Sequence, residues 1–294
     1  MKNFSDRLIE QCQKKKSLVL VGIDPRLDQL PEPLQKIAQK EGAAKAYELF
    51  GKEIIDAVKD IAVAVKPQIA FYEVLGAPGL EAFRETLLYA KEKGVLTISD
   101  AKRGDIGSTA EAYAEAFLSE NAAFPSDAVT VNGYLGVDGV LPFLKYCKSA
   151  GKGVYILVKT SNPGSGDFQD KILQDGKKVF ELVAEKVKEW GQDYIGSSGY
   201  SSVGAVVGAT WPEEALKLRA IMSTTPFLIP GYGAQGGSGK DAIVSMDKNG
   251  LGGIVNSSRG IIFAHRLKEF EKYAQKDWQT AVRLAAEKMR ADLK

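Results

Sequence analysis

The residues with the clearest potential for chemistry lie at 100–107, in the order Asp-Ala-Lys-Arg-Gly-Asp-Ile-Gly. They follow the apolar, β-branched run at 94–99, which predicts a buried strand. Alternate side chains of a strand share a face, so we expect Asp100 and Lys102 to project together, with Asp105 beyond the strand. Charges crowded at a strand end are costly to bury unless they compensate one another, and such groups often have shifted pKa values that serve catalysis. The segment therefore predicts an active site.

A second lysine, Lys66, interrupts the apolar run at 61–69. Burying a lysine there is unfavourable unless its ammonium reaches solvent at the strand end or meets an opposite charge. Asp100 would supply that charge, and the series Lys66, Asp100, Lys102 and Asp105 would alternate in sign, which makes mutual burial tolerable. We interpret the four residues as a functional cluster rather than a structural salt-bridge network. The place of Asp105 beyond the strand leaves open whether it points into the same pocket as Asp100.

Apolar runs that predict buried strands alternate with amphipathic segments that predict helices. Strands are expected at 17–24, 61–69, 94–100, 127–132, 153–159, 203–208, 225–230 and 252–256. Helices are expected at 1–8, which does not resemble a signal peptide, and at 44–59, 79–92, 108–119, 137–149, 172–190, 212–221, 239–248 and 277–292, the last with Asp277 as N-cap. Eight strands alternating with helices favour one (β/α)8 TIM barrel domain over residues 1–294, with an open doubly wound sheet as the less favoured alternative. Segments near 30–42 and 160–176 look like loop insertions.

In a barrel the carboxyl ends of the strands converge on one mouth, so polar residues at those ends are candidates for binding. The run 230–237, Pro-Gly-Tyr-Gly-Ala-Gln-Gly-Gly, follows the seventh expected strand, and Arg259 follows the eighth. Loops at these two positions are the usual phosphate site of the fold, where backbone amides and an arginine suit an anion. We therefore expect a ligand that carries a phosphate.

Composition narrows the possible classes of function. The chain has 294 residues, 45% of them hydrophobic, and a net charge of +2, which predicts neither nucleic-acid nor membrane binding. Its two cysteines, Cys12 and Cys147, match no metal-ligand spacing and indicate a reducing, cytoplasmic setting, and no run approaches membrane-spanning length. The single histidine, His265, excludes a multi-histidine metal centre and argues against a histidine-dependent triad. Lysine and aspartate are the residues expected to carry the chemistry.

The motif at 100–106 fits the pattern D-x-K-x-x-D-I, and the chain resembles the orotidine 5′-phosphate decarboxylase family in its longer bacterial (type 2) form. Further segments match that family in order, at 21–25, 65–67, 160–164 and 230–237, and Arg259 follows at the expected place. The resemblance implies decarboxylation of orotidine 5′-monophosphate to UMP, the last step of de novo pyrimidine synthesis, without metal or cofactor.

The resemblance also implies roles for individual residues. Lys102 would protonate C6 as carbon dioxide leaves, beside Asp100 and Lys66. Asp105, with Ile106 and Thr109, would enter the site from the other subunit of a homodimer. The substrate-binding set would comprise Asp24 at the ribose, Ser161 at the pyrimidine, Gln235 between base and phosphate, Arg259 at the phosphate, and Pro230.

Three alternatives remain open. A magnesium-dependent decarboxylase or synthase of sugar phosphates would need an additional acid where this chain has Lys66. A Schiff-base aldolase would use Lys66, Lys102 or Lys159 as its nucleophile. A catalytically silent barrel that binds nucleotide phosphates would have no need for desolvated carboxylates.

Overall fold

The structure is a computed structural model, which describes residues 2–233, 236–273 and 277–294. Eight parallel strands pair in sequence order, and β8 returns to pair with β1, so the sheet closes into a barrel. The strands are β1 (Val19–Ile23), β2 (Ala64–Pro67), β3 (Leu96–Arg103), β4 (Ala128–Val131), β5 (Gly153–Lys159), β6 (Val203–Val207), β7 (Phe227–Ile229) and β8 (Gly253–Ser257). Each overlaps a predicted run, although β3 and β8 extend past the predicted ends at 100 and 256. This confirms the (β/α)8 barrel, and the closing pair rules out the open sheet.

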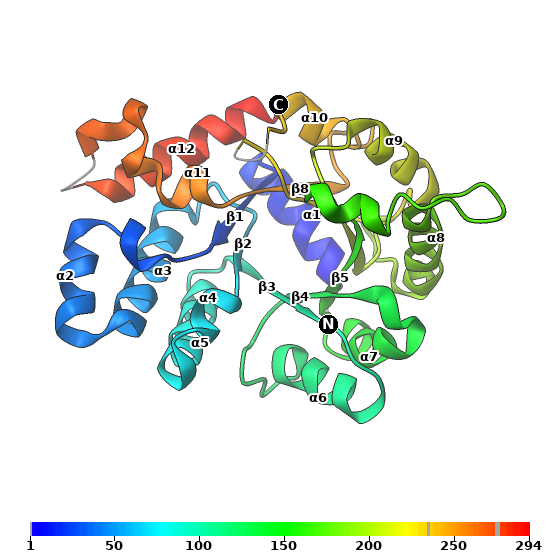
Figure 1. The fold of residues 1–294 in the computed structure, drawn as a ribbon, viewed down its shortest axis with the longest axis horizontal. Coiled ribbons are helices and arrows are strands. Elements are labelled where there is room, and N and C mark those ends of the chain that lie inside the picture. Colours follow the sequence, from blue (N-terminus) through cyan, green and yellow to red (C-terminus); the bar gives the residue numbers. More distant parts are fainter. Residues whose placement is uncertain (1, 234–235, 274–276) are drawn as a thin grey trace.

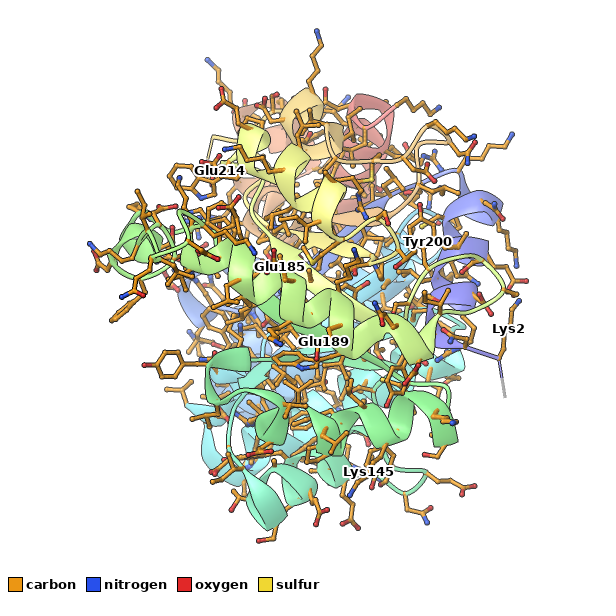
Figure 2. All side chains as sticks on the ribbon, turned by 90° about the vertical axis from the view of Figure 1, so that its right-hand side faces the viewer. Lys2, Lys145, Glu185, Glu189, Tyr200 and Glu214 are labelled. Carbon is orange, nitrogen blue, oxygen red and sulfur yellow. The ribbon has the colours of Figure 1, made fainter. Side chains whose placement is uncertain are left out.

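Helices occupy the connections between strands and surround the barrel (Figure 1). The longer ones are α3 (Ala43–Val58), α5 (Gly76–Glu92), α6 (Gly107–Leu118), α7 (Leu141–Ser149), α8 (Val179–Gly191), α9 (Pro212–Ile221) and α12 (Trp278–Asp292), and the short ones are α4 (Ala70–Glu73), α10 (Gly239–Ile243) and α11 (Arg259–Ile262). Their apolar sides pack on the strands, and charged residues such as Glu185 and Glu189 of α8 lie on the outer surface (Figure 2). None of the described helices is long and apolar enough to cross a membrane.

Three predicted helices are shorter than expected. The helix expected at 137–149 begins at Leu141, because residues 137–139 form a separate 3-10 turn before it. The helix predicted from 172 is wrong up to Lys178, because Asp175 and Gly176 form a tight turn instead. In this turn Gly176 has φ +84°, and the Leu173 N–H donates to the Lys177 carbonyl at 2.7 Å. Helix α10 ends at Ile243 instead of 248. The chain then turns around Asp247, whose carboxylate accepts from the amides of residues 249 and 251.

Other local predictions need smaller corrections. The segment near 30–42 does lie in the β1–β2 connection, but most of it forms helix α2 (Glu32–Glu41), with Pro33 in its first turn, where a missing N–H is tolerated. Asp277 occupies the N-cap position of α12. Its carboxylate accepts from the Thr280 hydroxyl at 2.7 Å rather than from a helix amide.

The N-terminal helix, α1 (Phe4–Lys15), closes the end of the barrel where the strands begin. Its Arg7 donates to the carbonyl of Gly151, just before β5, and its Lys15 donates to the carbonyl of Ala62, just before β2. The Phe4 ring is fully buried against the barrel. With this end covered, the opposite end, where the strands finish, is the one available for a site.

Candidate active site

The charged cluster at the strand ends is centred on Asp100. One carboxylate oxygen lies 2.6 Å from Lys66 Nζ, and the other lies 2.6 Å from Lys102 Nζ. Burial by itself would raise the pKa of Asp100, but the two ammonium groups outweigh it and hold that pKa well below its usual range. Burial would likewise lower the pKa of Lys66, but Asp100 and then Asp24 raise it. Asp100 and Lys66 are therefore both charged at neutral pH.

The two lysines differ in access. The Lys66 side chain is 6% exposed, whereas that of Lys102 is 47% exposed. Lys66 is thus a fixed internal charge, and Lys102 is the ammonium that a molecule entering the mouth can meet. The prediction that Asp100 and Lys102 share one side of the strand agrees with this geometry.

Thr130 of β4 ties the motif to the barrel and was missed by sequence reasoning. Its hydroxyl donates to Asp100 at 3.1 Å and accepts from the amides of Ala101 and Lys102 at 3.0 and 2.9 Å. These bonds accompany a register shift between β3 and β4 and a left-handed backbone at Lys102, with φ +43°. Left-handed backbone in a lysine is strained by about 1–3 kcal/mol and is typical of functional positions. The one polar residue between two valines in the run 127–132 was the signal that could have found Thr130.

A cavity of about 720 Å³ opens at the carboxyl ends of the strands. Seven residues predicted from the sequence line it: Asp24, Lys66, Asp100, Lys102, Ser161, Pro230 and Arg259. They come from the ends of six different strands, which is how a parallel barrel assembles a site from residues that are distant in sequence.

The walls of this cavity differ in polarity. The charged cluster occupies the side formed by β2 and β3, whereas Leu157, Val206 and Leu228 line the side formed by β5 to β7. These apolar residues were also missed, although inward alternation along each strand could have indicated them. Arg259, which follows β8, also lines the cavity, and only β1 separates its strand from β2. The cavity can therefore hold a ligand with an apolar planar part, an anionic end and a group beside the ammonium of Lys102.

Asp105, Ile106 and Thr109 do not line the cavity of their own chain. The Asp105 carboxylate accepts from the Ile106 amide at 2.8 Å, and no ion pair joins it to another residue in the described part of the chain. The expected cluster of four charges therefore contains three within one chain. Gln235, the remaining predicted residue, lies outside the described residues.

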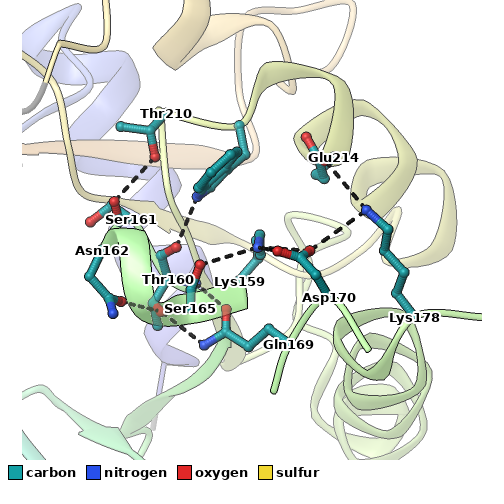
Figure 3. Close-up of polar contacts among 11 residues, drawn as sticks. Lys159, Thr160, Ser161, Asn162, Ser165, Gln169, Asp170, Lys178, Thr210 and Glu214 are labelled. Carbon is teal, nitrogen blue, oxygen red and sulfur yellow. Dashed lines mark hydrogen bonds and ion pairs between the residues drawn. The ribbon is translucent and has the colours of Figure 1, made fainter. Parts of the chain in front are cut away.

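Lys159, which the sequence left as a possible Schiff-base nucleophile, does not line the cavity. Its side chain is fully buried and its ammonium lies 2.8 Å from the carboxylate of Asp170 (Figure 3). A fully buried nitrogen that is enclosed in an ion pair is inaccessible to a carbonyl substrate. This removes Lys159 from the candidate nucleophiles.

The remaining candidate groups for metal or thiol chemistry lie away from the mouth. Cys12 and Cys147 are free and buried, which raises the pKa of each thiol to about 12. His265 is buried beside Trp278. Within residues 2–233, 236–273 and 277–294, no group of three or more His, Cys, Asp or Glu side chains is placed to hold a metal ion.

Known proteins resemble this chain along its whole length. The family model described as "Orotidine 5′-phosphate decarboxylase / HUMPS family" matches residues 43–273. The orotidine 5′-phosphate decarboxylase of Rhodopirellula baltica is 45% identical and covers 100% of both chains, and that of Clostridium perfringens (strain SM101) is 47% identical over 92% of each. The solved OMP decarboxylase of Leishmania donovani superposes with a TM-score of 0.78 at 31% identity, covering 99% of this chain and 97% of that one. The chain therefore belongs to the orotidine 5′-phosphate decarboxylase / HUMPS family.

Proposed function

We propose that this protein decarboxylates orotidine 5′-monophosphate to UMP and carbon dioxide, the last step of de novo pyrimidine biosynthesis. The observation that carries the proposal is the Asp100 carboxylate held between two ammonium groups at 2.6 Å, in a cavity that Arg259 also lines. Relatives that are 45–47% identical carry the name of this enzyme. The chemistry needs no metal or cofactor, because the protein's own charges can perform it.

Loss of carbon dioxide leaves a carbanion at C6, in an orbital that the ring π-system does not delocalise. Stabilisation must come from charge that is oriented before the reaction begins. The ammonium of Lys102 meets this need, because Asp100 fixes it while its side chain remains open to the cavity. Transfer of a proton from Lys102 Nζ to C6 completes UMP and leaves a neutral amine, which regains a proton from solvent.

Asp100 is assigned a place beside the substrate carboxylate. Departure of carbon dioxide removes one of two adjacent negative charges, so this contact becomes less unfavourable as the reaction proceeds. The buried ammonium of Lys66 is paired with the other carboxylate oxygen of Asp100, and this pairing keeps Asp100 ionised throughout the reaction. Binding of the distant phosphate by Arg259 supplies free energy that holds the substrate in this arrangement.

Unpartnered acceptors in the cavity support the placing of the ribose. One carboxylate oxygen of Asp24 and the amide oxygen of Asn256 are buried without a hydrogen-bond donor among the described residues. Buried acceptors of this kind are rare unless a ligand or water supplies the donor. Hydroxyls of the ribose are assigned to Asp24 and Lys66, and the amide edge of the pyrimidine to Ser161. Gln235 and Pro230 complete the substrate-binding set.

A homodimer is the second part of the proposal, with Asp105, Ile106 and Thr109 serving the partner's site. Exposed apolar side chains on adjoining segments support it, since patches of this kind mark interfaces. They are Ile106, Tyr134, Leu135, Val137 and Leu141, with exposed fractions from 44% to 86%. A cytoplasmic location completes the proposal and agrees with two unpaired thiols.

The test is the loss of orotidine 5′-monophosphate absorbance on adding purified protein in the presence of a chelator. We expect full turnover with chelator, and at least a 10³-fold lower kcat for Lys102→Ala, on the order of the loss of a general acid and a preorganised charge. The affinity of that variant for UMP should stay within about threefold, because the other contacts remain. Near-normal turnover by Lys102→Ala would overturn the mechanism. Loss of activity with chelator would favour a magnesium-dependent sugar-phosphate enzyme instead.

A further inference from the structure

The buried ammonium of Lys159 lies beneath the segment 160–170, which follows β5. It donates to both oxygens of Asp170 at 3.0 and 2.8 Å and to the Ser165 hydroxyl at 3.2 Å (Figure 3). The ammonium also lies 4.6 Å from the centre of the Trp211 ring, which provides a favourable cation–π contact. One side chain from the barrel thus holds the middle and the end of this loop.

The start of the same loop is held by a second set of bonds. The Thr160 amide donates to the Gln169 side chain at 2.9 Å, and that side chain donates back to the Thr160 hydroxyl at 2.8 Å. The indole N–H of Trp211 donates to the Thr160 carbonyl at 3.0 Å. Figure 3 shows these contacts closing the loop on itself, with Ser161 next to the held residue. Ser161 lines the cavity.

Burying the Lys159 ammonium has a large desolvation free energy, which is unfavourable for a residue that only stabilises the fold. Such an ion pair contributes little compared with well-packed apolar side chains, because the Lys159 ammonium is fully desolvated while Asp170 remains 32% exposed. The ion pair instead selects one conformation of the loop, because Asp170 reaches the ammonium only in that conformation. Residues 160–162, 164, 165, 168 and 169 line the cavity, so the conformation of the loop sets the shape of this part of the site.

We propose that Lys159 is a positioning residue, whose ion pair with Asp170 orients the 160–170 loop so that Ser161 meets the pyrimidine. The proposal rests on the proposed function, and it assigns to Lys159 a role without contact to substrate. Lys159 acts through Ser161, and it makes no contact with Asp100 or Lys102.

The test is a double-mutant cycle between Lys159→Met and Ser161→Ala. Lys159→Met should lower kcat/KM for orotidine 5′-monophosphate by about 10- to 100-fold, mostly through KM, which is the range of coupling expected for residues that act together. In the Ser161→Ala background the same change should lower kcat/KM by less than about threefold, because the contact it positions is already gone. Lys145→Met breaks an exposed pair with Glu111 and should leave kcat/KM unchanged.

A second pair of variants keeps the test decisive if Lys159→Met folds poorly. Asp170→Asn preserves the shape of a side chain that is 32% exposed, and it should raise KM by about 10-fold with kcat within about threefold. Asp170→Leu should be more harmful than Lys159→Met. It leaves an ammonium buried without its counter-charge, whereas a freed Asp170 still has solvent and Lys178 at 3.6 Å.

The outcomes separate the two proposals. A wild-type protein that does not consume orotidine 5′-monophosphate refutes the proposed function. An active wild type with additive effects of Lys159→Met and Ser161→Ala, or with unchanged KM in Asp170→Asn, refutes the positioning role alone.

Discussion

At the residue scale, the site depends on one carboxylate that serves two ammonium groups. Asp100 has each oxygen paired with a lysine, so the cluster of three keeps a net positive charge. That charge suits a substrate with an anionic group at the reacting carbon, and the fixed geometry removes the need for reorganisation during the reaction. The strained backbone of Lys102 persists because Thr130 holds two consecutive amides.

Thr130 therefore gives a residue-scale prediction. Thr130→Val keeps the shape but removes a hydroxyl that satisfies Asp100 and two amides, so we expect a loss of about 1–3 kcal/mol in the free energy of unfolding. The kcat should fall at least about 10-fold as the Lys102 backbone relaxes. Urea unfolding and steady-state kinetics measure the two effects. Thr130→Ser keeps the hydroxyl and should restore most of both, and an equal loss in the serine variant would contradict this role.

The single histidine gives a pH prediction. Burial, and then the charge of Arg266, lower the pKa of His265 to about 4. The unfolded chain would bind a proton near pH 6.5, so this group contributes stability that is fully present above pH 6.5 and is lost as pH falls towards 4. One imidazole resonance in an NMR titration reports the value directly. A midpoint near 6.5 would refute the assignment, and His265→Gln should flatten the pH dependence of unfolding in this window.

At the scale of elements, the barrel separates stability from chemistry. Helix α1 closes the end where the strands begin, while loops at the other end carry the site. Its Phe4 ring packs so tightly on β5 that a Cβ on Gly153 would lie 2.2 Å from it. The glycine at the start of β5 therefore provides the space that α1 requires.

This arrangement predicts a mutation that changes stability without changing catalysis. Phe4→Ala should lower the free energy of unfolding by about 3–5 kcal/mol, as expected for a fully buried aromatic ring. The kcat at 25 °C should stay within about twofold, because the site lies at the opposite end. Val74→Ala, at a side chain 77% exposed, is the matched control and should change stability by less than about 0.5 kcal/mol. A large fall in kcat for the folded Phe4→Ala protein would show that the two ends are coupled.

At the scale of the whole molecule, one chain does not complete the predicted cluster. Asp105 stands beside an exposed apolar surface rather than in its own cavity. A symmetric dimer would bring the Asp105 of each subunit to the other, since every contact in such an interface occurs twice.

Mixing two inactive variants tests this arrangement. Lys102→Ala and Asp105→Ala proteins, each inactive alone, should regain about a quarter of wild-type activity when they are dissociated and reassembled in equal amounts. Half of the dimers are then mixed, and each mixed dimer has one of its two sites intact. No recovery, in a mixture whose subunits demonstrably exchange, would place Asp105 in its own subunit's site.

Local information was sufficient for most of the fold and for the residues at strand ends. Apolar runs predicted all eight strands because burial on both faces of a parallel strand leaves a continuous apolar pattern. Because the carboxyl ends of the strands converge, Asp24, Lys66, Asp100 and Arg259 were expected to line the same mouth of the barrel. The turn at Asp175 and Gly176 was missed, because its local signal competed with an apolar periodicity that continues across it.

The sequence by itself therefore determined the barrel, the family and the identity of the charged residues, since these follow from local patterns and motifs. Only the tertiary structure decided how those residues act. It placed the Thr130 hydroxyl in a hydrogen bond with Asp100. It left Asp105 outside the cavity of its own chain and buried Lys159 beneath the 160–170 loop. The physical reason is that each of these outcomes depends on contacts between segments distant in the chain, whose register and direction no local pattern specifies.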